Sequence, residues 1–145
     1  MNLWEQFDKV IDTAALANDI ETADVGGYKE VPHGEYEVAV EKMELKASKK
    51  GDPMVTIWFK IVSGEFERSM LFMNQVLTMP FHYAIVNGML SSLAPGVEIK
   101  FETFTQYGEL IEDIFELIHE QNEYALKYGE KKGFPTFEII DVFAN

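Results

Sequence analysis

A tryptophan and a lysine share one face of a β-type stretch near the middle of the chain. Residues 54–61 alternate between two sets: Val55, Ile57, Phe59 and Ile61 on one side, and Met54, Thr56, Trp58 and Lys60 on the other. This is the period-two pattern of a strand. A half-buried strand normally shows water a polar face, whereas here Trp58 stands beside Lys60. An indole can stack on a nucleobase while an ammonium group neutralises a phosphate. The alternative is that Trp58 is covered in a core or an interface.

Basic side chains gather at two predicted turns of an otherwise acidic chain. The formal net charge is −13, which argues against general nucleic-acid binding because such proteins present a basic patch. The distribution matters more than the total, however. Lysines cluster at the turn over 47–53 and again at the turn over 129–133, while residues 98–123 carry eight acids against one lysine. The sequence therefore predicts that basic and acidic surfaces are segregated.

From these features we predict that cationic side chains contact phosphates and aromatic side chains stack on bases. Each type has an ordinary alternative: lysines are common in solvated turns, Arg68 can pair with Glu65 or Glu67, and tyrosines can pack in a core. The predicted nucleic-acid contacts are Lys46, Lys49, Lys50, Trp58, Lys60, Phe66, Arg68, Tyr124, Lys127, Tyr128, Lys131 and Lys132.

No catalytic or metal-binding motif stands out. His33, His82 and His119 are isolated from one another, and none has the spacing of a His-Glu-x-x-His site. Cysteine is absent, which excludes disulfides and thiolate chemistry and fits a reducing cytoplasm. No apolar run approaches the ~18–20 residues of a membrane span, and no signal peptide is visible. We therefore expect a non-enzymatic protein of the host cytoplasm, with no cofactor, no metal and no membrane partner.

Hydrophobic periodicity divides the chain into an N-terminal helix and arm, residues 1–30, and one domain, residues 31–145. In the first predicted strand Tyr36, Val38 and Val40 are out of phase with Met43 and Leu45, which predicts a β-bulge. The expected elements are a helix over 2–11, an arm over 12–30, strands over about 35–46, 54–62 and 66–77, a helical insert over about 80–120 whose second helix spans 107–120, and a hairpin over 124–143.

Five strands with a helix between the third and the fourth follow the order of the oligonucleotide-binding fold, or OB-fold. The predicted fold class is therefore a β-barrel with α insertions (α+β), a five-stranded OB-fold with a short N-terminal helix. In that fold the ligand crosses strands two and three, between the loops that join strands one to two and four to five. Those two loops would be the two lysine turns, and this coincidence carries the prediction.

Residues 31–77, together with the segment over 7–12, also resemble a known family. The resemblance rests on Val31-Pro32-His33-Gly34-Glu35-Tyr36-Glu37-Val38, on Ser48-Lys49-Lys50-Gly51-Asp52-Pro53-Met54, and on Gly64 and Phe72. The family is phage-encoded and occurs in replication and recombination modules of phages of low-GC Gram-positive bacteria. It was long described as of unknown function and is regarded as single-stranded DNA-binding. The resemblance implies an OB-fold and DNA binding, and it transfers no catalytic residue.

The sequence leads to two hypotheses. The first is a non-catalytic protein that coats and protects single-stranded DNA during phage replication or recombination, as a homo-oligomer that presents the strand to a recombinase or replisome protein. The second is an acidic phage protein that binds a host or phage protein, as a DNA mimic or scaffold, without binding DNA. The net charge of −13 favours the second, and the segregated lysines favour the first.

Overall fold

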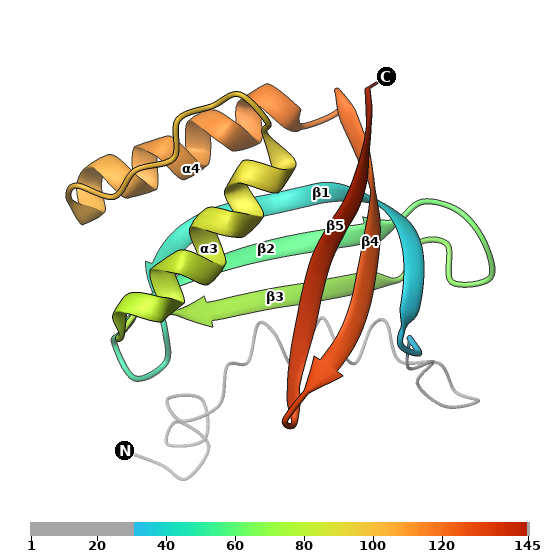
Figure 1. Ribbon diagram of the computed structural model, residues 1–145, viewed down its shortest axis with the longest axis horizontal. Coiled ribbons are helices and arrows are strands. Elements are labelled where there is room, and N and C mark those ends of the chain that lie inside the picture. The colour runs from blue at the N-terminus through green and yellow to red at the C-terminus, as the bar shows by residue number, and fades with distance from the viewer. Residues whose placement is uncertain (1–30, 145) are drawn as a thin grey trace, which may run out of the picture. The chain divides into compact units, whose positions relative to one another are not determined.

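The structure is a computed structural model that describes residues 31–144. Pro32–Asn145 form a compact unit by themselves. The predicted helix over 2–11 and arm over 12–30 lie outside the described residues. In chain order the elements are β1 (Gly34–Ala47), β2 (Pro53–Ile61), β3 (Met70–Val76), α3 (Pro80–Leu93), α4 (Phe104–Ile118), β4 (Asn122–Lys131) and β5 (Phe134–Ala144) (Figure 1).

The five strands form one open antiparallel sheet in the order β3-β2-β1-β4-β5. The predicted closed barrel of the OB-fold is therefore wrong. Closure would need hydrogen bonds between β3 and β5, but these strands are the two edges of the sheet. Instead α3 contacts both edge strands. Chain order alone did not reveal this, because the same order of elements is compatible with a closed and an open sheet.

The predicted β-bulge in the first strand is confirmed. The pairing of β1 with β2 shifts register between Val40 and Lys42. Before this point β1 pairs with β4, and beyond it only with β2. An extra residue increases local twist and bend, and β4 and β5 cross in front of the other strands (Figure 1). The sheet coils so far that Phe59 of β2 stacks on Phe137 of β5, with ring centroids 5.9 Å apart.

The core lies inside this coiled sheet and beneath the two helices. Pro80 occupies the first position of α3, where its missing N–H costs nothing. The Nδ1 atom of His82 accepts hydrogen bonds from the backbone N–H groups of Thr78 and Met79, 3.1 Å each, and so satisfies donors at this helix start. Thr103 caps α4 by accepting from the N–H of Gln106 at 3.1 Å.

Helix α4 packs on β1 with one apolar face. Tyr107, Ile111, Ile114 and Ile118 are buried along this face, at the three- and four-residue spacing of an amphipathic helix. The helix begins three residues before the predicted span of 107–120 because Thr103 provides its cap. Among the described residues, no helix combines the length and the apolar character that a membrane crossing requires.

Candidate nucleic-acid interface

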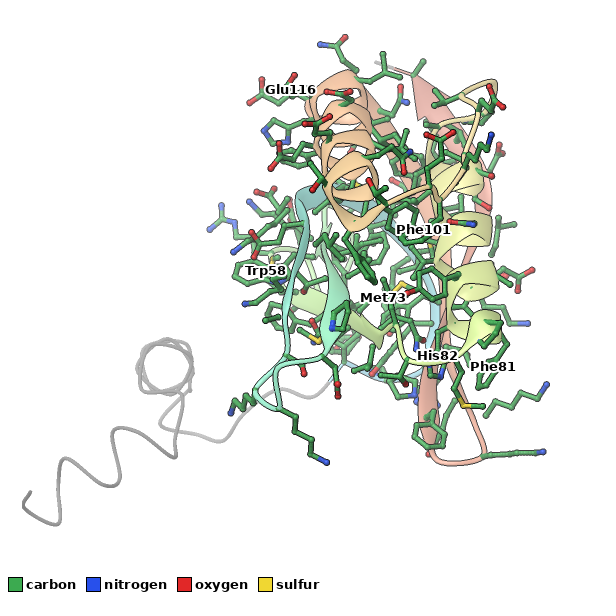
Figure 2. All side chains as sticks on the ribbon, turned by 90° about the vertical axis from the view of Figure 1, so that its left-hand side faces the viewer. Trp58, Met73, Phe81, His82, Phe101 and Glu116 are labelled. Carbon is green, nitrogen blue, oxygen red and sulfur yellow. The ribbon has the colours of Figure 1, made fainter. Side chains whose placement is uncertain are left out.

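One side of β1, β2 and β3 turns away from the core, and we call it the outer sheet face. Its polar and aromatic side chains are Lys42, Glu44, Lys46, Thr56, Trp58, Lys60, Phe72 and Asn74, as the strand registers show. The predicted alternation in β2 is confirmed, because Val55, Ile57, Phe59 and Ile61 are at most 1% exposed. Figure 2 shows Trp58 projecting on the side of the domain opposite to α3.

The centre of the outer sheet face is a row of three side chains from three strands. Trp58 of β2 pairs with Lys42 of β1 on one side and with Phe72 of β3 on the other. The rings of Trp58 and Phe72 meet edge to face, with centroids 5.3 Å apart at 89°. The Nζ atom of Lys42 lies 4.6 Å from the Trp58 ring centroid, within the range of a cation–π interaction. Phe72 remains 41% exposed, so this row offers an aromatic surface to solvent.

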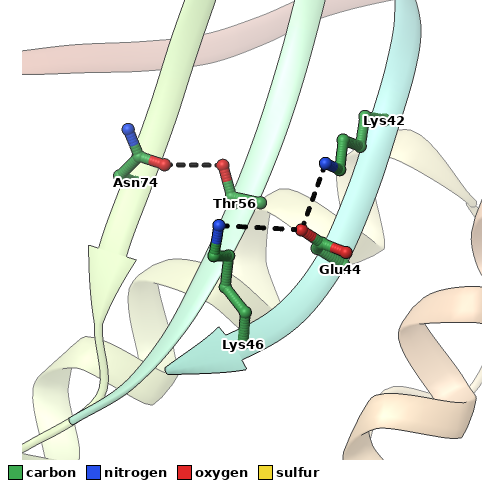
Figure 3. A network of polar contacts seen from close by, with 5 residues as sticks. All are labelled: Lys42, Glu44, Lys46, Thr56 and Asn74. Atoms are coloured by element: carbon green, nitrogen blue, oxygen red, sulfur yellow. Dashed lines mark hydrogen bonds and ion pairs between the residues drawn. The ribbon is translucent and has the colours of Figure 1, made fainter. Parts of the chain in front are cut away.

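A polar row lies beside the aromatic one (Figure 3). The hydroxyl of Thr56 donates to Oδ1 of Asn74 at 2.5 Å, which satisfies the buried hydroxyl. Glu44 accepts from Lys42 at 3.3 Å and lies 3.9 Å from Lys46. Exposed ion pairs of this kind contribute about 0–1 kcal/mol. Both lysines can therefore exchange Glu44 for another anion at little cost.

Five of the predicted contacts gather on this face or at its end. Lys46, Trp58 and Lys60 lie on the outer sheet face, and Lys49 and Lys50 are exposed in the turn that joins β1 to β2. Backbone hydrogen bonds across residues 48–52 fix this turn, and its glycine at position 51 has the positive φ of 87° that favours glycine. The turn therefore holds its two lysines beyond the ends of β1 and β2, five residues along β2 from the aromatic row.

The second lysine cluster lies elsewhere. Lys131 and Lys132 are exposed at the tip of the β4–β5 hairpin, which runs along the side of the domain away from Trp58 (Figure 2). Lys127 pairs in register with Glu35 and Glu138, so its charge is locally offset. Both lysine turns lie toward the same end of the domain in Figure 1, but Figure 2 shows the hairpin on the side away from Trp58, so the two turns do not flank the aromatic row together.

Phe66 and Arg68 belong to the connection between β2 and β3, because β3 begins at Met70 and not at residue 66. Phe66 packs edge-on against Tyr36, with centroids 6.1 Å apart, and Arg68 is exposed with φ of 76°. Tyr128 packs between His33 and Phe137, at 5.2 and 5.4 Å. These residues lie off the outer sheet face.

The prediction that Tyr124 stacks on a base is wrong. Its side chain is 0% exposed, and its hydroxyl donates to the carbonyl of Leu93 at 2.6 Å. Burial raises the pKa of this hydroxyl above its ordinary value of 10.0. The alternation of Tyr124 and Leu126 marks the inner face of the coiled sheet, so a base cannot reach the ring without opening the core.

The contacts predicted from the sequence did not include three residues of the outer sheet face and one exposed aromatic. Lys42, Phe72 and Asn74 become neighbours of β2 only through strand register. The position of Lys42 could have been inferred from the phase slip around residue 41. Before a bulge at this point the even-numbered residues of β1 face the core, and after it they face outward. Phe134 is 73% exposed beside the hairpin lysines, and no period in the sequence marks it.

Among residues 31–144 no three His, Cys, Asp or Glu side chains are grouped so that they could hold a metal ion. The three histidines lie apart in separate roles. His33 packs on Tyr128, His82 caps α3, and His119 Nε2 lies 3.7 Å from Glu120. The outer sheet face combines two aromatic rings with lysines, one carboxylate and one amide.

A family model described as protein of unknown function (DUF669) matches residues 18–89. This span includes β1, β2, β3 and the first part of α3, and therefore the whole outer sheet face. The β4–β5 hairpin lies outside it. No curated protein matches the sequence.

Proposed function

We propose that the protein binds single-stranded DNA without catalysis, with the outer sheet face as its binding surface. The observation that carries the proposal is the exposed Phe72 beside the half-buried Trp58, with Lys42 over the Trp58 ring. Aromatic rings on a sheet give bases a stacking platform worth roughly 1–3 kcal/mol per base. Stacking accepts any base, so sequence preference is weak.

Local charge supports this use of the face despite the acidic total. Residues 42–62 contain five lysines against two acids, and neither β2 nor β3 contains an acid. The acids of α4 lie on its solvent side, and Figure 2 places Glu116 at the opposite end of the domain from the β1–β2 turn. A phosphate chain that approaches the outer sheet face therefore meets mainly positive charge.

Binding would rearrange one contact. Lys42 now lies over the Trp58 ring and also reaches Glu44. When a base stacks on Trp58 or Phe72, the Lys42 ammonium group moves to the phosphate that follows. Lys46, Lys49 and Lys50 continue the phosphate track to the β1–β2 turn. Duplex DNA fits poorly, because its bases are already stacked and cannot lie on the rings.

The resemblance to a phage single-stranded DNA-binding family supports the same function, and the DUF669 match to residues 18–89 covers the surface concerned. In this proposal the protein coats and protects single strands during phage replication or recombination in the host cytoplasm. It then presents them to a recombinase or replisome protein.

The test is a fluorescence titration with an oligo-dT of about 30 nucleotides, at low and high salt, with duplex DNA as control. A Trp4→Phe background leaves Trp58 as the one tryptophan. We expect dT to quench Trp58 and Phe72→Ala to weaken binding about 5- to 150-fold, the equivalent of one stacked base. Phe104→Ala is the matched control, because Phe104 is similarly exposed, at 46%, on α4. Equal affinity of both variants would refute the assignment.

A second test separates the two lysine turns. Lys49→Glu with Lys50→Glu and Lys131→Glu with Lys132→Glu change the net charge by the same amount. The first pair should weaken binding more and should flatten the slope of log K against log salt by about 0.7 for each phosphate that the protein no longer neutralises. If the hairpin variant binds more weakly than the β1–β2 turn variant, the binding surface is not the outer sheet face.

The rival function, binding of a protein partner through acidic surface, is favoured by α4. Its solvent side carries Glu109, Glu112, Asp113 and Glu116, all exposed. The same titration decides between the two. Absence of quenching and of a gel shift with dT at low salt would exclude the DNA proposal and support the protein-binding one.

A further inference from the structure

Helix α3 belongs to an uncharged stretch of the chain. Residues 69–97 contain no Asp, Glu, Lys or Arg, although 26% of the chain is charged. A surface helix normally turns polar and charged side chains to water. Here Met79, Phe81 and Ile85 are 52%, 55% and 45% exposed at the start of the helix and along its outward face. Figure 2 shows Phe81 at the surface, on the side opposite to Trp58.

Side-chain size along this outward face changes from one end to the other. Phe81 and Ile85 occupy its N-terminal half, whereas Gly88 and Ser92 follow one and two turns later. A Cβ atom added at Gly88 would meet nothing within 4 Å. The C-terminal half of the face is therefore a shallow strip that leaves room for large side chains from elsewhere.

We propose that α3 is a homodimer contact, packed antiparallel against α3 of a second copy across a two-fold axis. The antiparallel arrangement sets Ile85 of each copy against Gly88 of the other, and Phe81 against Ser92. A two-fold interface must be self-complementary, and the large-to-small gradient of this face meets that condition. Glycine also permits close approach of two helix backbones.

The absence of charge on the outward face of α3 favours a second copy of the chain as its partner. At a net charge of −13, most pairs of surfaces on two copies repel each other. The outward face of α3 carries no charge, so two copies can meet there without placing like charges in contact. A DNA or basic partner would gain nothing from this neutral face. Because α3 and the outer sheet face lie on opposite sides (Figure 2), both DNA surfaces of the dimer stay accessible.

Sedimentation equilibrium of the full chain tests the proposal, from about 1 μM to about 1 mM, where small interfaces associate. We expect the mass to rise from 16.6 kDa toward twice that value. Gly88→Gln fills the strip with a larger side chain that also favours helix formation. The mass of this variant should therefore stay at 16.6 kDa, and its melting temperature should be no lower than that of the wild type. Leu117→Gln is the control: Leu117 is 56% exposed on α4, and its replacement should leave the dimer intact.

A constant mass of 16.6 kDa for the wild type would overturn the proposal, and so would a Gly88→Gln dimer as tight as the wild type. The readout is independent of DNA binding, so either proposal can fail alone.

Disulfide trapping tests the antiparallel register. The chain contains no native cysteine, so only the introduced cysteines can form a disulfide. Phe81→Cys mixed with Ser92→Cys should give a disulfide-linked dimer on mild oxidation. Each variant alone should not, because positions 81 of the two copies would lie about 16 Å apart along the helices, beyond disulfide reach. Equal cross-linking of the single variants would refute the antiparallel register.

Discussion

The hydroxyl of Tyr107 should govern part of the stability of the domain in alkali. Tyr107 lies on the buried face of α4, where its side chain is 0% exposed. Its hydroxyl donates a hydrogen bond to Oδ1 of Asn87. Burial, with a smaller electrostatic contribution from Tyr83, raises the pKa of Tyr107 from 10.0 to about 12. The folded protein therefore holds this phenol neutral at a pH where the unfolded chain has already ionised it.

The sign and size of the effect follow from this pKa difference. Because the folded pKa is the higher one, the stabilisation is complete below pH 10 and is lost as pH rises toward 12. The loss amounts to about 1.4 kcal/mol at pH 11 and approaches about 2.7 kcal/mol above pH 12. Tyr107→Phe cannot ionise, but it removes the hydrogen bond to Asn87, which costs about 1 kcal/mol at any pH.

The wild type should thus be more stable than Tyr107→Phe by about 1 kcal/mol at pH 8, and the two should be nearly equal at pH 11. Urea unfolding followed by circular dichroism at pH 8, 9.5 and 11 measures this difference. Deprotonation of lysines affects both proteins alike and cancels in the comparison. A difference between the two proteins that stays constant from pH 8 to pH 11 would show that the Tyr107 pKa is not raised, and the reasoning would fail.

Two further predictions concern the start of α3 and two glycines, one in the β1–β2 turn and one within α3. His82→Ala leaves the N–H groups that begin α3 without their acceptor, so we expect a loss of about 1 kcal/mol in the free energy of unfolding; an unchanged urea midpoint would contradict this role. Gly51→Ala places a side chain on a residue with a φ of 87°, so it should lower the free energy of unfolding by about 1 kcal/mol or more. Gly88→Ala lies on the exposed side of α3 and should raise the free energy of unfolding by about 0.4–1 kcal/mol in dilute solution. Thermal melts of both variants check the pair, and equal shifts would argue against the turn geometry.

Local structure could be predicted from sequence wherever one face of an element is buried. The alternation in β2 and the phase slip in β1 indicated the strand faces and the bulge, because burial fixes which side chains share a face. Barrel closure could not be predicted in this way. It depends on whether β3 and β5 exchange hydrogen bonds, and no pattern within either strand encodes the distance between them.

The candidate site shows the same division. The position of Trp58 could be predicted because it alternates with the buried residues of its own strand, β2. Phe72 and Lys42 reach Trp58 only through register with β3 and β1. The prediction for Tyr124 was wrong because the alternating pattern of a strand is the same whether its apolar face contacts a ligand or the core. The coiling of the sheet depends on long-range contacts, and it buries the Tyr124 side chain in the core.

An acidic chain can bind phosphate when its charges are separated by more than the screening distance. The acids of α4 lie on the side of the helix away from its buried face, so at least a helix diameter of about 10 Å stands between them and the sheet. That distance equals the Debye length of about 10 Å at 0.1 M salt. At this ionic strength a phosphate on the outer sheet face interacts mainly with the charges of that face, which are its lysines and Glu44. At much lower salt it also experiences the net charge of −13, and the rise in affinity on lowering the salt should therefore level off.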